Sequence, residues 1–145
     1  MDIYALIRQD HQRVKELFRK LESEEATGEA KARLYDSLKR ELSMHKEAEE
    51  ATFYAALSTL PEISDRIEEA LEEHVDIDEL LQEMDEIESD SETFMAQLAE
   101  LREEVEHHVG EEENEIFARA RELLTDEQAE KIGAEMQAQK ERLVS

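Results

Sequence analysis

The sequence predicts an all-α protein: an up-down-up-down four-helix bundle with a short C-terminal fifth helix. The 145 residues include only three glycines and one proline, and residues that favour helices dominate the composition. Apolar residues recur at a spacing of three and four in five stretches, which is typical of helices that bury one face. The predicted connections are short, so consecutive helices run antiparallel. We therefore expect a single domain over residues 1–145, with the bundle at about 2–122 and the additional helix at about 125–143.

The first two helices are predicted over about residues 2–24 and 29–59. The apolar stripe of the first consists of Ile3, Ile7, Val14, Phe18 and Leu21. Thr27 and Gly28 then interrupt the pattern, because these residue types are typical of helix caps and turns. The stripe of the second consists of Leu34, Leu38, Leu42, Phe53 and Ala56.

The last three helices each begin at a recognisable signal. Pro61 suits the first turn of the third helix, whose stripe continues through Ile63, Ile67, Leu71, Leu81 and Met84. Ser89 and Glu92 resemble a capping box that opens the fourth helix, with the stripe Phe94, Leu98, Leu101, Val105 and Ile116. Thr125 and Gln128 repeat this signature before a shorter fifth helix with Ile132, Met136 and Leu143.

The composition excludes several classes of function. Forty-one acidic residues against seventeen basic ones give a formal charge of −24, which repels nucleic acid phosphates and anionic membrane surfaces, so we expect neither partner. No apolar run approaches the roughly 20 residues that span a bilayer, and the N-terminus lacks the features of a cleavable signal, so a cytoplasmic location is expected. The absence of cysteine excludes disulfides, thiolate metal sites and cysteine nucleophiles.

Four histidines lie in the buried stripes of four successive predicted helices: His11, His45, His74 and His108. Glu49 follows His45 by four residues and Glu112 follows His108 by four, so each pair shares one helix face. At about 1.5 Å per residue, the distances from the three turns place all four histidines within about one helical turn of the same height. We therefore expect these six side chains to converge inside the bundle.

This convergence predicts a metal site. Each unpaired polar group in a small core costs about 1 to 3 kcal/mol, and a bound cation satisfies all six together. Six ligands exceed the three or four of a zinc site, and the mixture of imidazole and carboxylate suits iron or manganese. Two ions fit better than one, because Glu49 and Glu112 can each bridge both. The excess positive charge favours hydroxide, oxo, peroxide or superoxide between the ions.

Other residues near these positions are weaker candidates. Asp78 follows His74 by four residues and would supply a seventh ligand or a hydrogen bond to an imidazole, although acids are frequent enough to explain this spacing by chance. Glu113 and Glu41 are candidates of the same sort. His107 is out of phase by one residue and is expected on the surface.

Four segments of the chain together carry a family resemblance: DHQRV at His11, HKEAEEATFY at His45, EEHVDIDELL at His74 and HHVGEEENEIF at His108. They resemble the hemerythrin-like HHE cation-binding domains over about residues 2 to 122. The resemblance implies a four-helix bundle with a non-haem di-iron centre, two iron ions joined by an oxo or hydroxo bridge. The ligands it implies are His11, His45, Glu49, His74, His108 and Glu112.

The chain departs from the oxygen-carrying hemerythrins at two positions. Those proteins have a second histidine where this chain has Asp78, and an acid five residues after the last histidine, where Glu113 rather than Glu112 would match. A shell with fewer nitrogen and more oxygen ligands stabilises the ferric state, because harder ligands favour the harder ion. We therefore expect a centre that oxidises readily rather than a reversible oxygen carrier.

Three functions follow as expectations. The first is a di-iron protein that binds dioxygen or handles reactive oxygen or nitrogen species, with peroxide- or nitric-oxide-directed redox activity as part of a response to oxidative stress. The alternative is an iron or oxygen sensor, or a binding protein of iron homeostasis. The third is a structural bundle in which zinc or another ion holds the core together. The lack of an appended signalling or output region favours a self-contained scavenger or binder, and the electron donor is left open.

Overall fold

The computed structural model describes residues 1–23 and 26–144, which form five helical rods. In chain order the elements are α1 (Ile3–Leu21), α2 (Gly28–Glu49), η1 (Glu50–Tyr54), α3 (Ala55–Ser58), α4 (Ser64–Met84), α5 (Glu92–Glu111), η2 (Glu112–Ile116), α6 (Phe117–Leu123) and α7 (Asp126–Val144). The segments α2, η1 and α3 follow one another without a break and make one long rod, as do α5, η2 and α6. The described residues contain no strand, so the predicted all-α class is confirmed.

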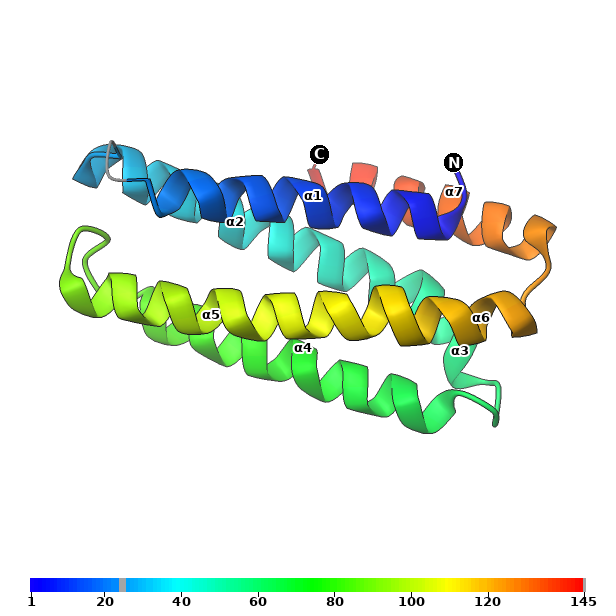
Figure 1. Cartoon of the computed structure of the whole chain (residues 1–145). Helices are drawn as coiled ribbons and strands as arrows, with labels where there is room; N and C mark the ends of the chain where they lie inside the picture. The colour runs from blue at the N-terminus through cyan, green and yellow to red at the C-terminus, as the bar shows by residue number, and fades with distance from the viewer. Residues whose placement is uncertain (24–25, 145) are drawn as a thin grey trace.

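The rods form an up-down-up-down bundle of two antiparallel hairpins, as the sequence predicts (Figure 1). The first hairpin is made by α1 and α2, and the second by α4 and α5. The short fifth rod, α7, turns back along the bundle and packs against α1, α2 and η1. In the part of the chain that the structure describes, no helix is both long and apolar enough to cross a membrane.

Two predicted helix starts differ from the structure. Pro61 lies in a turn, and α4 begins only at Ser64, because Ile63 has a non-helical backbone (φ −135°). The predicted cap at Ser89 is wrong: Ser91 caps α5 by accepting a hydrogen bond from the Phe94 amide at 3.1 Å. Ser89 instead donates to the Gly28 carbonyl oxygen at 3.3 Å. The first helix ends at Leu21, and its predicted end at residue 24 lies outside the described residues.

The capping box predicted for the fifth helix is present. The Thr125 amide donates to Gln128 Oε1 at 2.8 Å, and the Gln128 amide donates to Thr125 Oγ1 at 3.1 Å. The helix it opens docks closely on the start of the chain, because a Cβ atom added to Gly133 would lie 2.6 Å from the Met1 carbonyl oxygen. Only glycine permits this approach between α7 and the beginning of α1.

The apolar core consists of two clusters on either side of a polar layer. One cluster, at the end of the bundle that holds the N-terminus, is rich in aromatic side chains and includes Tyr4, Phe53, Tyr54, Phe117 and Met136. The other lies toward the α1–α2 and α4–α5 turns and includes Val14, Phe18, Leu38, Leu81 and Leu101. The four stripe histidines are buried between the two clusters. This position shields them from bulk water while leaving their ring nitrogens in need of partners.

Candidate metal centre

The inner nitrogen atoms of the four histidines face one another across the middle of the bundle. The Nε2 atoms of His74 and His108 are 3.1 Å apart, and the rings of His11 and His45 have centroids 5.2 Å apart. The imidazoles thus form two pairs, one from each hairpin, and none of the four is more than 8% exposed. The structure therefore brings together the histidines that the sequence singles out.

Each of the two glutamates reaches both histidine pairs. Glu49 Oε2 lies 3.4 Å from His45 Nε2, and Glu49 Oε1 lies 3.3 Å from His74 Nε2. Glu112 Oε1 lies 3.1 Å from His11 Nε2, and Glu112 Oε2 lies 3.9 Å from His108 Nε2. One oxygen of each carboxylate thus faces each hairpin, which is the arrangement that a bridging carboxylate requires.

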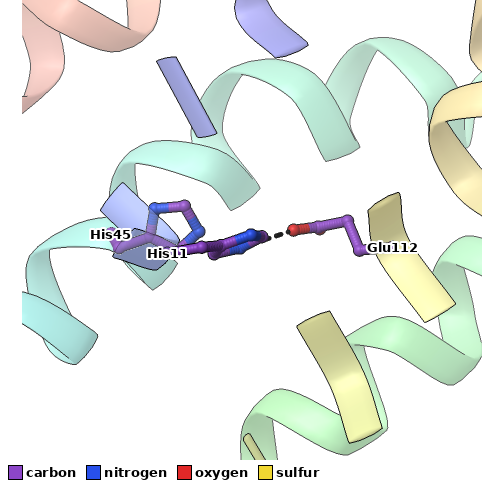
Figure 2. A group of neighbouring side chains, drawn as sticks. All are labelled: His11, His45 and Glu112. Carbon is purple, nitrogen blue, oxygen red and sulfur yellow. Dashed lines mark ion pairs between the residues drawn. The ribbon is translucent and has the colours of Figure 1, made fainter. Parts of the chain in front are cut away.

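Two sets of three side chains are spaced for one cation each. The first set is His11, His45 and Glu112, and the second is Glu49, His74 and His108. Figure 2 shows the first set, with the His11 ring directed at the Glu112 carboxylate across the bundle and the His45 ring beside it. Each set takes its imidazoles from one hairpin and its carboxylate from the other, so the two hairpins complete each other.

The donor atoms fit metal ions better than they fit one another. Four atoms in the middle of the cluster are buried and make no hydrogen bond of normal geometry: His45 Nε2, both carboxylate oxygens of Glu49, and Glu112 Oε1. Native cores seldom leave such groups unsatisfied, since each costs about 1 to 3 kcal/mol. Divalent cations bound to imidazole nitrogen and carboxylate oxygen would satisfy all four atoms.

The outer nitrogen of each imidazole binds a carboxylate. Glu113 was a candidate for such a role from the sequence, whereas the other three partners were missed. His11 Nδ1 lies 2.6 Å from Glu113, and His45 Nδ1 lies 2.8 Å from Asp10. His74 Nδ1 lies 2.7 Å from Glu50, and His108 Nδ1 lies 2.7 Å from Glu73. Because an ionised carboxylate only accepts, each Nδ1–H donates, and each Nε2 faces the centre, where it can bind a metal ion or a proton.

The four acceptors follow one rule, which is repeated in both hairpins. The residue before the first histidine of each hairpin binds the second: Asp10 binds His45, and Glu73 binds His108. The residue after each inner glutamate binds the first histidine of the other hairpin, as Glu50 does with His74 and Glu113 with His11. The two histidines of each hairpin are 34 residues apart in both cases. The centre thus has an approximate twofold repeat.

The remaining candidates lie outside the cluster. Asp78 accepts a hydrogen bond from Lys46 Nζ at 2.6 Å and so pairs with a lysine rather than an imidazole. Glu41 lines a surface groove together with Arg13 and Arg40. Glu113 is near the centre only as the partner of His11 Nδ1.

His107 is on the surface, as expected, with 62% of its side chain exposed. It lies near Glu73 and Glu111, a third group with metal-like spacing among the described residues. Arg66 Nη2 donates to Glu111 at 2.6 Å, and Glu73 is already bound to His108. Both acids of this group thus already have partners, whereas several donor atoms of the buried centre have no hydrogen-bond partner.

Tyr54 is the aromatic residue of the centre that helical periodicity did not indicate. Its hydroxyl donates to Glu112 Oε2, and its ring stacks on His74 with centroids 5.3 Å apart. Five residues of α-helix would turn Tyr54 about 140° away from Glu49. The π-helical segment η1 begins directly after Glu49 and brings Tyr54 back to the inner face. The second hairpin has the same device, since η2 begins at Glu112.

The charges of the cluster shift the pKa values of its members. Burial opposes protonation of His45, but Glu49 and Asp10 outweigh it and raise the pKa of His45 to about 10. Burial likewise opposes protonation of His74, yet Glu49 and Glu50 raise its pKa to about 9. Burial favours the neutral form of Glu49, and His45 and His74 overcome this and hold its pKa well below the usual range. Without metal, these acids therefore favour the protonated forms of His45 and His74.

We expect the metal-free protein to lose stability as the pH rises from neutral to 10. A histidine whose pKa in the folded state lies above its ordinary value of 6.5 adds to the free energy of unfolding, and this contribution is complete below pH 6.5. The contribution is lost as the pH passes through about 9 for His74 and about 10 for His45. Urea unfolding in the presence of a chelator, repeated between pH 6 and 10, measures this loss of stability. The His107→Gln variant should give the same profile, and a flat profile in the parent protein would contradict the prediction.

A small cavity adjoins the histidines. Its volume is about 30 Å³, close to the volume of one water molecule in the liquid. It is lined by His11, Val14, Leu42, His45, Lys46, His74, Ile77, Asp78, Val105, His108 and Val109. All four imidazoles and a mostly apolar wall thus enclose a space for a ligand of one or two heavy atoms.

Comparison with known proteins assigns the family. Residues 2–120 match the family described as "Hemerythrin HHE cation binding domain". The chain belongs to this family. A solved structure titled a hemerythrin HHE cation binding domain-containing protein, from Mycobacterium kansasii, superposes with a TM-score of 0.86 and 25% identity. The superposition covers 99% of this chain and 87% of that chain. The family and fold that the four segments suggested are therefore confirmed.

One curated relative is longer than this chain. A protein named DNA nickase from a Nostoc species is 28% identical over 143 residues, which are 99% of this chain and 40% of the relative. The chain thus spans about two fifths of the length of that relative. The similarity covers the bundle and α7 together.

Proposed function

We propose that this protein holds two iron ions at a carboxylate-bridged site and uses them to bind dioxygen or to react with peroxide or nitric oxide. One observation carries the proposal: each of two buried glutamates directs one oxygen to each of two histidine pairs. The proposed ligands are His11, His45, Glu49, His74, His108 and Glu112. The proposed cofactor is a pair of iron ions with an oxo or hydroxo bridge.

Iron bound there would supply electron transfer and a Lewis acid for a small ligand. The chain supplies the positions of the donors. The carboxylates at Nδ1 fix the tautomer and orientation of each imidazole and raise its basicity. Tyr54 donates its hydroxyl hydrogen to Glu112 and so restricts that carboxylate. The two apolar clusters exclude bulk water from both ends of the centre.

The cavity and the charge support a small, neutral ligand. A space of about 30 Å³ beside the imidazoles suits a ligand of one or two heavy atoms rather than a larger organic substrate. The formal charge of −24 repels anions, so uncharged dioxygen, hydrogen peroxide and nitric oxide enter more readily than superoxide. The same charge would repel DNA, so the proposal includes no nucleic-acid partner. A single domain over residues 1–145 and a cytoplasmic location also belong to this proposal.

Elemental analysis and an optical spectrum of protein purified without added metal test the proposal. We expect about two irons per chain and absorption bands in the near ultraviolet and visible that change with dioxygen, peroxide or nitric oxide. A colourless zinc protein would refute it. Iron absorption bands that do not change with dioxygen, peroxide or nitric oxide, together with a loss of helix content on iron removal, would favour the sensor or iron-homeostasis alternative.

A further inference from the structure

Among the four acceptors of histidine Nδ1, the twofold repeat is broken at the carboxylate of Asp10. The other three acceptors of histidine Nδ1 are partly exposed: the side chains of Glu50, Glu73 and Glu113 are 35%, 17% and 26% exposed. The Asp10 side chain is only 1% exposed, because α7 covers it. The additional helix α7 thus buries the acceptor of one histidine in the pair His11 and His45, and the pair His74 and His108 has no such cover.

The contact from α7 to Asp10 is made by a buried lysine. Lys140 Nζ donates to Asp10 Oδ1, while Asp10 Oδ2 accepts from His45 Nδ1 at 2.8 Å. Lys140 is 6% exposed, and the Asp10 carboxylate therefore connects a charged residue of α7 directly to a proposed metal ligand. Arg13, half-exposed on α1, is a second cation near Asp10, with Nη1 3.4 Å from Oδ1.

Leaving either charge of the Lys140–Asp10 ion pair buried without its partner would destabilise the fold. Removing one partner of a buried ion pair is strongly destabilising, because the charge of the other partner stays buried and uncompensated. If α7 leaves the bundle, Asp10 is exposed to water and the His45 ring loses a fixed acceptor. If the His45 ring changes position, Asp10 loses one of its two anchors. The docking of α7 and the orientation of His45 therefore depend on each other.

We propose that Lys140 is a positioning residue for the metal centre, so that metal binding and the docking of α7 stabilise each other. The inference rests on the proposed function only in taking His45 as a metal ligand. Coupling between two binding events is reciprocal: if docked α7 tightens metal binding by a given factor, bound metal tightens the docking of α7 by the same factor. The pair His11 and His45 is the half of the centre that depends on α7.

A second contact on the same face of α7 allows the docking to be disturbed without changing Lys140. Gly133 lies seven residues before Lys140, about two helical turns, and packs on the backbone of residues 1–3. Alanine at this position would bring its Cβ to 2.9 Å from Asp2 C and Ile3 N, so the backbone must move apart. Because alanine has a higher helix propensity than glycine, any loss of docking in Gly133→Ala is not a loss of helix propensity.

Hydrogen exchange on the unmodified full chain is the first test. Peptides from Asp126–Val144 are compared between chelator-treated protein and protein loaded with ferrous iron without oxygen, or with zinc. We expect loading to slow exchange in α7 about tenfold, as the coupling of two events by a typical allosteric free energy predicts. Unchanged exchange in α7 of a chain that carries metal would overturn the coupling and leave the proposed function intact. A chain that binds neither metal would overturn both.

Matched variants identify the residue responsible. Lys140→Met is expected to lower the affinity for one of the two metal ions about tenfold, which is at the lower end of the effect of removing a direct hydrogen-bond partner of a ligating histidine. It should also abolish the slowing of hydrogen exchange in α7 on metal loading. Lys140→Arg should restore both, because it keeps the charge. Lys131→Met is the control, since Lys131 is exposed on the same helix.

Gly133→Ala provides the independent variant if Lys140→Met does not fold. It should loosen α7 and weaken the same metal ion with all ligands and Asp10 unchanged. Equal metal affinities in the parent, Lys140→Met and Gly133→Ala would overturn the role of α7. Behaviour of Lys140→Met that matches Lys131→Met would overturn the role of Lys140.

Discussion

The Glu49→Ala variant is expected to retain at most one metal ion per chain in place of about two. Glu49 contributes one oxygen toward His45 and one toward His74, so its removal takes a donor from both halves of the centre. The measurement is metal per chain by elemental analysis, with helix content checked by circular dichroism.

Two further variants make this result interpretable. Glu47→Ala removes an exposed glutamate from the same helix and should keep the full metal content. Glu49→Gln keeps the volume of the side chain but removes its charge, and it should also lose metal, which separates ligand loss from packing loss. Full occupancy in both Glu49 variants would count decisively against a bridging role for this residue.

Removing the metal is expected to lower the melting temperature by roughly 10 to 20 °C. An ion present at about 100 times its dissociation constant stabilises the folded state by about 2.7 kcal/mol, so two ions contribute on the order of 5 kcal/mol. For a chain of this size, each kcal/mol shifts the midpoint by about 2 to 4 °C. Calorimetry before and after chelation, with the loss of metal verified, measures the effect.

The unsatisfied atoms at the centre explain why this effect should be large. His45 Nε2, Glu49 and Glu112 Oε1 are buried without normal hydrogen bonds, so the metal-free fold retains their desolvation cost. In Glu49→Ala, chelation should lower the midpoint by a smaller amount, because fewer ions are there to remove. An unchanged midpoint in fully demetallated parent protein would show that the ions add nothing to the fold.

Helical periodicity predicted the bundle and the meeting of the six inner side chains, because both depend on a repeat of 3.6 residues. It failed where the repeat changes. Tyr54 is out of phase with Glu49 in an α-helix, and only the π-helical segment η1 brings it to the centre. The spacing of four residues after His108 selected Glu112 rather than Glu113, and Glu112 is indeed fully buried and faces the histidines, while Glu113 faces outward to His11 Nδ1.

Apart from Glu113, which was a candidate, the acceptors of histidine Nδ1 had a signal in the sequence that the composition hid. Asp10 and Glu73 come directly before a predicted ligand, and Glu50 and Glu113 directly after one. In a chain with 41 acidic residues, an acid beside a ligand carries little information by itself. The caps were decided by local geometry in the same way: Ser89 and Ser91 both suit a helix start, and only the path of the turn selects Ser91.

The exchange of partners between hairpins has a consequence during synthesis of the chain. Both ring nitrogens of His11 have partners in the second hairpin, Glu112 and Glu113, and both ring nitrogens of His74 have partners in the first, Glu49 and Glu50. A nascent chain with only its first hairpin folded holds His11 without either acid. Metal ions at the proposed centre would therefore be held firmly only after the second half of the chain has been translated and has docked, which would keep the proposed redox chemistry away from incomplete chains.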